Sequence, residues 1–223
     1  MIHVGTSGWS YPEWKSSFYG GIPQRRWLEH YASVFTAVEA HMTARRSITV
    51  SVAEKWTSAV PKGFRFATKA PPWAAAKQDD LPQRAERFAT SLAPLGQHVG
   101  PVLLVPPFKR DENALQALLG VWPRNLQIAL ELRHDSWAKS NAPKIAAEYG
   151  VALVTVDRQE TTGPLALTAD HAYIRLRRDS YRSTELKRWA EDIRRLGADT
   201  TWVFVRHGED APAIAADLHE LVA

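Results

Sequence analysis

The alternation of strand-like and helix-like segments constrains the fold of this 223-residue chain more than any other feature. Short apolar or β-branched runs such as Ile2–Thr6 are followed by amphipathic stretches such as Gln24–Phe35. Because successive β–α units pair their strands in parallel through right-handed crossovers, this pattern predicts an α/β fold. The expected strands are Ile2–Thr6, Thr36–His41, Phe64–Lys69, Val99–Val105, Gln127–Arg133, Val151–Val156, Ala172–Arg177 and Thr201–Arg206.

Seven helices are expected to accompany these eight strands. They cover Gln24–Phe35, Val50–Ala59, Pro82–Leu95, Asp111–Leu119, Lys139–Tyr149, Ser183–Leu196 and Ala211–Val222. The sixth connection, from Asp157 to His171, is short and contains Gly-Pro, so its helix is expected to be short or missing. Eight β–α units favour one (β/α)₈ barrel of the TIM type, a single domain over residues 1–223. An open doubly wound sheet has the same local pattern, but no Gly-x-Gly-x-x-Gly follows the first strand.

Composition excludes some chemistry and leaves the ligand open. The chain has no cysteine, which excludes disulfides, thiolate metal ligands and cysteine nucleophiles. Its net charge of +4 weakly favours anionic ligands, nucleic acid included, although an ordinary arginine-rich surface is the favoured explanation. No leader-like start or membrane-length apolar run is found, so we expect a cytoplasmic protein without a membrane partner. The oligomeric state stays open.

Strand alternation selects the side chains expected inside the barrel. In the fifth strand Ile128 and Leu130 suit the helix-facing side, which leaves Glu131 and Arg133 pointing inward. Ligands bind at the C-terminal strand ends of such barrels, so these two side chains are expected at the mouth. The further polar groups expected around this mouth are Glu39, Lys69, Asp157, Arg175, Arg177 and Arg206.

The first β–α connection adds hydroxyl groups and aromatic rings. Thr6 and Ser7 offer hydroxyls and amides where an anion can bind. Five aromatic residues follow between Trp9 and Tyr19, and they suit either a platform for a ligand or a flap that plugs the mouth with its own rings. We expect the flap, with Trp9 still reaching the site.

Buried charges must either pair with one another or hold a ligand, because isolated ones are costly. One interpretation is therefore a closed ring of ion pairs, in which Glu131 pairs with Arg175 and Glu39 pairs with Lys69. The other is a ligand site, favoured because the polar residues recur at strand ends.

Several motifs occur together in one order: GTSGWSYPEWKSSFY, TAVE, FRFATKA, ELRHDSW, and YIRLRRDSY followed by ELKRWAEDI. Over nearly the whole chain this set resembles the YecE-like family, domain of unknown function 72. The resemblance implies a single TIM barrel and brings no established reaction, although likeness to endonuclease-IV-like and xylose-isomerase-like barrels suggests nucleic-acid or metal chemistry. The matching residues are Gly5, Thr6, Ser7, Gly8, Trp9, Glu39, Lys69, Glu131, Arg133, His134, Trp137, Asp157, Arg175, Arg206 and His207.

Three strand ends depart from the family pattern. After Val-Glu the chain continues from Ala40 to Arg45 as AHMTAR, where the family has an Asn-rich run ending Thr-Phe-Tyr. The run Leu103 to Pro107 lacks the family's glutamine, and Pro72, Trp73 and alanines replace a Thr-His pair. These changes indicate a different substrate or a lost activity.

The favoured function is an enzyme, such as a hydrolase, that uses acid–base chemistry on a small phosphate- or carboxylate-bearing substrate. Glu39 or Glu131 would be the acid or base, and Lys69 would stabilise negative charge. The expected ligand-binding residues are Thr6, Ser7, Trp9, Arg133, His134, Asp157, Arg175, Arg177 and Arg206. The alternatives are a non-catalytic protein that binds nucleic acid or a phosphometabolite, and an inert descendant held by ion pairs.

No metal ligand is assigned, and the cofactor is left unknown. A divalent metal would have Glu39, His41, Glu131, Asp157 and His207 available as oxygen and imidazole ligands. No paired histidine spacing supports such a site, so it is not favoured.

Overall fold

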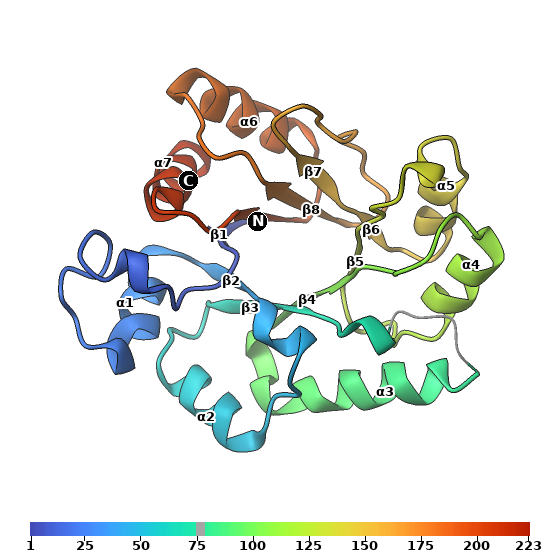
Figure 1. The fold of residues 1–223 in the computed structure, drawn as a ribbon, viewed down its shortest axis with the longest axis horizontal. Coiled ribbons are helices and arrows are strands. Elements are labelled where there is room, and N and C mark those ends of the chain that lie inside the picture. Colours follow the sequence, from blue (N-terminus) through green and yellow to red (C-terminus); the bar gives the residue numbers. More distant parts are fainter. Residues whose placement is uncertain (75–78) are drawn as a thin grey trace.

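In the computed structural model, which describes residues 1–74 and 79–223, nine strands form two parallel sheets (Figure 1). The four-stranded sheet has the order β1 (Ile2–Thr6), β9 (Thr200–Val205), β8 (His171–Leu176) and β7 (Thr155–Asp157). The five-stranded sheet has the order β2 (Ala37–Ala40), β3 (Arg65–Lys69), β4 (Val99–Leu104), β5 (Ile128–Leu130) and β6 (Ala152–Leu153). Ala75 and Ala76, two of the alanines in the altered third strand end, lie outside the described residues.

Seven α-helices lie outside the strands in the described part of the chain (Figure 1). They are α1 (Trp27–Val34), α2 (Val50–Ser58), α3 (Leu81–Leu92), α4 (Glu112–Gly120), α5 (Ala142–Glu148), α6 (Ser183–Arg195) and α7 (Ala211–Val222). Side-chain caps fix two of the starts: Thr49 accepts from the amide of Val52, and Asp111 accepts from that of Ala114. No described helix combines the length and the apolar character needed to cross a membrane.

The prediction of an α/β fold with seven helices is confirmed, and residues 158–170 contain no helix. The expected closed ladder of eight strands is not observed. Among the described strands, no hydrogen-bonded pairing joins β1 to β2, and the predicted strand Val151–Val156 is split into two short pieces. The split has a direct cause: β6 pairs with β5, whereas β7 pairs with β8, so each piece extends a different sheet.

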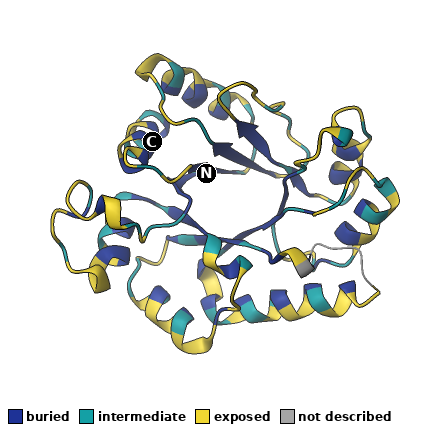
Figure 2. Ribbon diagram, in the orientation of Figure 1, coloured by how far each residue is buried: buried dark blue, intermediate teal, exposed yellow. Residues whose placement is uncertain are grey.

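Alternating side chains divide the core into two layers. The outward positions of the strands, such as Val38, Leu130 and Val203, pack with the helices, and each helix is buried on its strand-facing side (Figure 2). The interior positions form a separate cluster that draws on both sheets: Ala37, Ala67, Leu103, Ala129, Ala152, Val154, Val156, Tyr173, Trp202 and Phe204. The two sheets therefore share one apolar interior.

β1 and β2 approach each other closely at Gly5. A Cβ atom added to Gly5 would lie 1.9 Å from the carbonyl oxygen of Ala37 and 2.8 Å from the hydroxyl of Tyr31. Only glycine fits this approach, because the atom it would strike belongs to backbone.

We expect Gly5→Ala to lower the free energy of unfolding by about 3 kcal/mol or more, the upper end for overpacking. Urea denaturation measures the loss. Gly63→Ala is the matched control, since no atom lies within 4 Å of the added Cβ, and it should stay within about 0.5 kcal/mol of the wild type. Equal stabilities for the two variants would contradict the close approach of β1 and β2.

Candidate functional site

At the carboxyl ends of the strands the interior face of the sheets carries charged side chains. In β2, β3 and β5 an interior alanine is followed two positions later by Glu39, Lys69 and Glu131. In β8 the interior tyrosine is followed by Arg175 and Arg177 in the same alternation. All five come from the carboxyl ends of parallel strands, so they meet at one edge of the fold.

Glu39 is completely buried and is saturated by donors. One carboxylate oxygen accepts from Tyr173 at 2.8 Å and lies 3.0 Å from Arg175 Nε. The other accepts from Ser7 at 2.6 Å, from Arg177 at 3.0 Å and from His41. Burial alone would raise the pKa of Glu39, but the two guanidinium groups and His41 outweigh it and hold the pKa well below its usual value.

Arg175 joins Glu39 to the second buried carboxylate. Its Nη1 group donates to Glu131, and its Nη2 group lies 3.0 Å from Glu39. Glu131 also contacts Arg133 at 2.9 Å and Arg158 at 3.4 Å. Burial opposes the ionised form of Glu131, yet Arg175 and Arg133 lower its pKa overall. Both carboxylates and Arg175 are therefore fixed as charges.

Arg177 completes this buried cluster from the side of β1. Its Nη1 group donates to the Ser7 hydroxyl at 2.7 Å, and the same hydroxyl donates to Glu39. Burial lowers the pKa of Arg177, although Glu39 acts in the opposite direction. An arginine stays protonated at neutral pH even so. The two carboxylates thus face four guanidinium groups, which leaves the cluster with net positive charge.

Lys69 borders this cluster and lies at the junction of two cavities. Its ammonium group forms no ion pair with a carboxylate in residues 1–74 or 79–223. Burial, followed by the charges of Arg133 and Arg175, lowers its pKa. Thr43 fixes the backbone of Lys69, because the threonine hydroxyl accepts from the Lys69 amide at 2.9 Å and contacts its carbonyl oxygen at 2.8 Å.

The two cavities open on either side of Lys69. The larger has a volume of about 680 Å³ and is lined by the β1 and β2 connections, including Trp9, His41, Arg45 and Arg46. The smaller, of about 530 Å³, is lined by the β4 and β5 connections. Its other lining residues include Pro106, Phe108, Lys109, Arg133 and His134. Cations therefore border both cavities.

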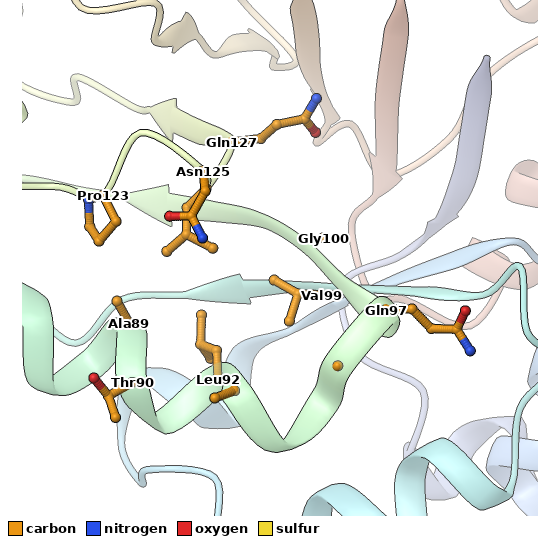
Figure 3. Close-up of a pocket in the computed structure, with 12 residues that line it drawn as sticks. Ala89, Thr90, Leu92, Gln97, Val99, Gly100, Pro123, Asn125 and Gln127 are labelled. Atoms are coloured by element: carbon orange, nitrogen blue, oxygen red, sulfur yellow. The ribbon is translucent and has the colours of Figure 1, made fainter.

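A third cavity lies at the opposite ends of the strands (Figure 3). It has a volume of about 590 Å³ and is lined by residues before β4 and β5, among them Gln97, Asn125 and Gln127. None of its lining residues is charged. It offers neutral hydrogen-bonding groups and none of the charged chemistry found beside Lys69.

A sequence model of the family described as protein of unknown function DUF72 matches residues 3–223. The chain belongs to the DUF72 family. It is 24% identical to a DUF72 family protein from Thermotoga maritima, with a TM-score of 0.86 over 100% of this chain and 99% of that one. A DUF72 family protein from Enterococcus faecalis is 21% identical, with a TM-score of 0.81 over 100% and 95% of the two chains. A comparison with curated proteins finds no match.

The resemblance to the YecE-like family is thereby confirmed, since YecE-like and DUF72 denote the same family. At these identities the two solved DUF72 proteins support the shared fold alone. The chemistry of the site in this DUF72 chain therefore follows from the chain's own residues.

Two residues expected at the mouth lie elsewhere. Asp157 is on the opposite face from Val156, and its partners are Arg178 at 2.9 Å and Thr162 at 2.6 Å. The expected position of Asp157 at the mouth is therefore corrected. Val156 points to the interior, so the next side chain points to the opposite face. Arg206 is half exposed and pairs with Asp179 at 2.7 Å, because it follows the last residue of β9 and extends over the surface.

Of the other expected ligand-binding residues, Thr6 is buried and holds the local structure together, whereas His134 and Arg133 are exposed or half exposed beside the smaller cavity. Thr6 is buried and donates to the carbonyl of Gly8 and contacts Tyr31, so it holds the first connection together. His134 is exposed and bonds locally to Ser136, although it lines the smaller cavity. Arg133 is half exposed and reaches Glu131 from the same cavity.

The aromatic loop packs mainly on itself, as expected for a flap. Trp14 and Tyr19 are fully buried, and Tyr19 stacks on Trp27 with ring centroids 4.5 Å apart. Trp9 contacts the rings of Trp56 and Phe66 and lines the larger cavity. Trp9 and Tyr11 of the loop thus border the candidate site.

The oxygen and imidazole groups considered for a metal do not assemble. Asp157 is turned away, and His207 stacks on Tyr11. Arginine groups contact the carboxylate oxygens of both Glu39 and Glu131, where a metal would bind. No group of three or more His, Cys, Asp or Glu in the described ranges is placed to hold a metal ion. The residues present do not fit a resident metal.

Three contributors were not assigned to the site from sequence. Arg158 lies in an irregular connection, so no periodicity points to it. Arg45 and Arg46 follow the short 3₁₀ turn His41–Ala44, which replaces the family's usual run. That departure was the available signal for a changed site.

We expect Arg175→Met to lower the free energy of unfolding at neutral pH by roughly 3–5 kcal/mol, because it leaves two buried carboxylates with too few partners. Chemical denaturation measures this loss. Arg206→Met removes a half-exposed arginine from a surface pair and should cost about 0.5 kcal/mol or less. Similar losses for the two variants would show that the cluster does not depend on Arg175.

The lowered pKa values of Glu39 and Glu131 set the direction of the pH dependence. Each carboxylate stabilises the fold fully above its usual pKa of 4.5, and this contribution is lost as the pH falls through the lower folded-state value. The melting temperature should therefore fall steeply below about pH 4.5. Glu131→Gln should flatten that fall, whereas Glu29→Gln, at an exposed pair, should leave it nearly unchanged. A wild-type melting temperature that is flat in acid would contradict the assigned charges.

Proposed function

We propose that this DUF72 protein binds a small phosphate- or carboxylate-bearing ligand at Lys69, between the two cavities. The observation that carries the proposal is the state of Lys69. Its side chain is half-buried beside a cluster with net positive charge. It forms no ion pair with a carboxylate of the described residues. A bound anion would supply the missing partner.

Further cations support an anionic ligand on both sides of Lys69. Arg45 and Arg46 line the larger cavity, and Lys109 and Arg133 line the smaller one. Low-dielectric walls with charge of one sign concentrate an oppositely charged ligand. The arrangement therefore favours anions and disfavours cations in either cavity.

The two buried carboxylates serve this site best as fixed charges. A general acid must hold a proton near neutral pH, and a strong base needs a pKa near the working pH. The pKa values of Glu39 and Glu131 are lowered, and arginines occupy their oxygens. Lys69 keeps the role expected from sequence, which is to stabilise negative charge on the ligand.

The size of the cavities favours a small molecule over a polymer. Volumes of about 530 and 680 Å³ fall in the range usual for small-molecule sites. A nucleic acid would need a continuous basic groove, whereas the cations here border two cavities. Nucleic-acid binding stays the alternative, and it predicts a steep dependence of affinity on salt.

We further propose that the two sheets act as one barrel around this site. The shared interior cluster and the close approach of Gly5 to Ala37 support it. On this proposal, side-chain packing completes the barrel where the hydrogen-bond ladder is interrupted.

Thermal denaturation with inorganic phosphate tests the site. At 100 times its dissociation constant, phosphate should stabilise the protein by about 2.7 kcal/mol, which is roughly 5–10 °C for a chain of this size. Lys69→Met should weaken binding about 10- to 100-fold, because a charged hydrogen bond is lost.

Lys187→Met is the matched control, since it removes the same charge from the exposed face of α6 and should bind phosphate like the wild type. If phosphate, sulfate and small carboxylates all leave the melting temperature unchanged, the anion site is refuted. If a single-stranded oligonucleotide binds instead, with strong salt dependence, the alternative function replaces it.

A further inference from the structure

We infer that His41, held by the buried carboxylate of Glu39, is a proton-transfer residue of the anion site. This inference rests on the proposed function and adds the chemistry that the anion site would perform. It places the proton transfer on a residue that sequence patterns connected only with a metal.

His41 and Glu39 form a dyad across the boundary between interior and cavity. The Nε2 atom of His41 hydrogen-bonds to Oε2 of Glu39. Glu39 is completely buried, whereas 35% of the His41 side chain is exposed, and its ring lines the larger cavity together with Lys69. A buried acceptor therefore orients an accessible imidazole, the arrangement that acid–base histidines use.

The direction of this hydrogen bond fixes the tautomer of His41. The Glu39 carboxylate already accepts from Ser7, Tyr173 and two arginines, so it is an ionised acceptor. The Nε2 atom must then carry the hydrogen. In the neutral ring the lone pair is on Nδ1, which has no hydrogen-bond partner among the described residues. The free nitrogen is thus the basic one.

The surrounding charges link protonation of His41 to anion binding. The Glu39 carboxylate contacts Nε2, and the Nη2 group of Arg175 lies 3.4 Å from the same nitrogen. The other charged or titratable groups around the ring are Arg177, His207, and the cavity-lining Lys69, Arg45, Arg46 and Tyr11. Cations outnumber carboxylates here, so a bound anion supplies the negative charge that lets Nδ1 accept a proton.

The step is a proton abstraction from a hydroxyl group of the bound anion or from a water that attacks it. The O–H bond breaks, its electron pair stays on oxygen, and an Nδ1–H bond forms. The resulting imidazolium faces the Glu39 carboxylate. The deprotonated oxygen, from water or from the substrate hydroxyl, bonds to the phosphorus or acyl carbon, and the bond from that atom to its leaving oxygen breaks. The Nδ1 proton then passes to the leaving oxygen, which restores the neutral ring. The substrate class is therefore a phosphate or carboxylate with a hydroxyl or a hydrolysable bond beside the charge.

Nitrogen NMR of the histidine side chains tests the dyad in the intact wild-type protein. His41→Asn assigns the His41 signals, and His134→Asn provides a control from the smaller cavity. In the free protein at neutral pH, His41 should be the neutral tautomer with hydrogen on Nε2. Saturating inorganic phosphate should shift the His41 Nδ1 signal and raise its proton affinity about tenfold, while His134 changes less.

Each outcome decides the inference. A neutral Nε2–H ring that responds to phosphate supports it. Hydrogen on Nδ1, or a doubly protonated ring at neutral pH, overturns it, since neither leaves a free base in the cavity. If phosphate raises the melting temperature without moving the His41 signals, the inference fails and the anion site stands. If phosphate does neither, the anion site itself is refuted and the inference falls with it.

Discussion

Arg175 connects the two sheets through charge. It comes from β8 in the four-stranded sheet. Its guanidinium group reaches two carboxylates of the five-stranded sheet, Glu39 in β2 and Glu131 directly after β5. Each of the three groups is almost inaccessible to water. Burying them is costly, so each depends on the others being in place. The relative position of the two sheets therefore depends on these three groups being charged, and their charges depend on the sheets holding that position.

A cluster of this kind contributes little net stability, because ion-pair energy mainly offsets the cost of desolvation. Its larger effect is on the surrounding field. Four guanidinium groups around two carboxylates leave positive charge at the strand ends. Together with burial, which is the larger cause, that field lowers the pKa of Lys69, the residue that both cavities share. The apolar interior below the cluster adds no competing charge. The proposed anion site thus depends on how the sheets are joined.

Much of this arrangement was predictable from alternation. The rule that set Glu131 opposite Leu130 also set Arg175 opposite Ile174, and in the structure Arg175 pairs with both Glu131 and Glu39. The ring of ion pairs was also anticipated, but with Lys69 as the partner of Glu39. The structure gives that role to Arg175 and Arg177, because they lie on the strand across the interior. Sequence spacing defines the faces of a strand and does not define which strands meet across the shared interior.

Other features depended on tertiary geometry. The expected sixth strand is divided because its residues pair with β5 and then with β8, which no local pattern indicates. His41 and Arg158 lie in connections, where periodicity gives no direction. Asp157 lies outside because Val154 and Val156 take the interior positions of their segment. Valine suits either face of a strand, so the alternation alone did not show on which face Asp157 lies.

The missing sixth helix connects these observations. In its place residues 158–170 form an irregular connection, anchored by Asp157, which binds Thr162 at 2.6 Å and Arg178 at 2.9 Å. This anchoring holds the start of the connection at the strand end, where Arg158 reaches Glu131. A full helix there would carry the chain away from the mouth within a turn or two, at 1.5 Å per residue. Arg158 thereby adds a fourth guanidinium group to the cluster, and with it part of the field around Lys69 and His41.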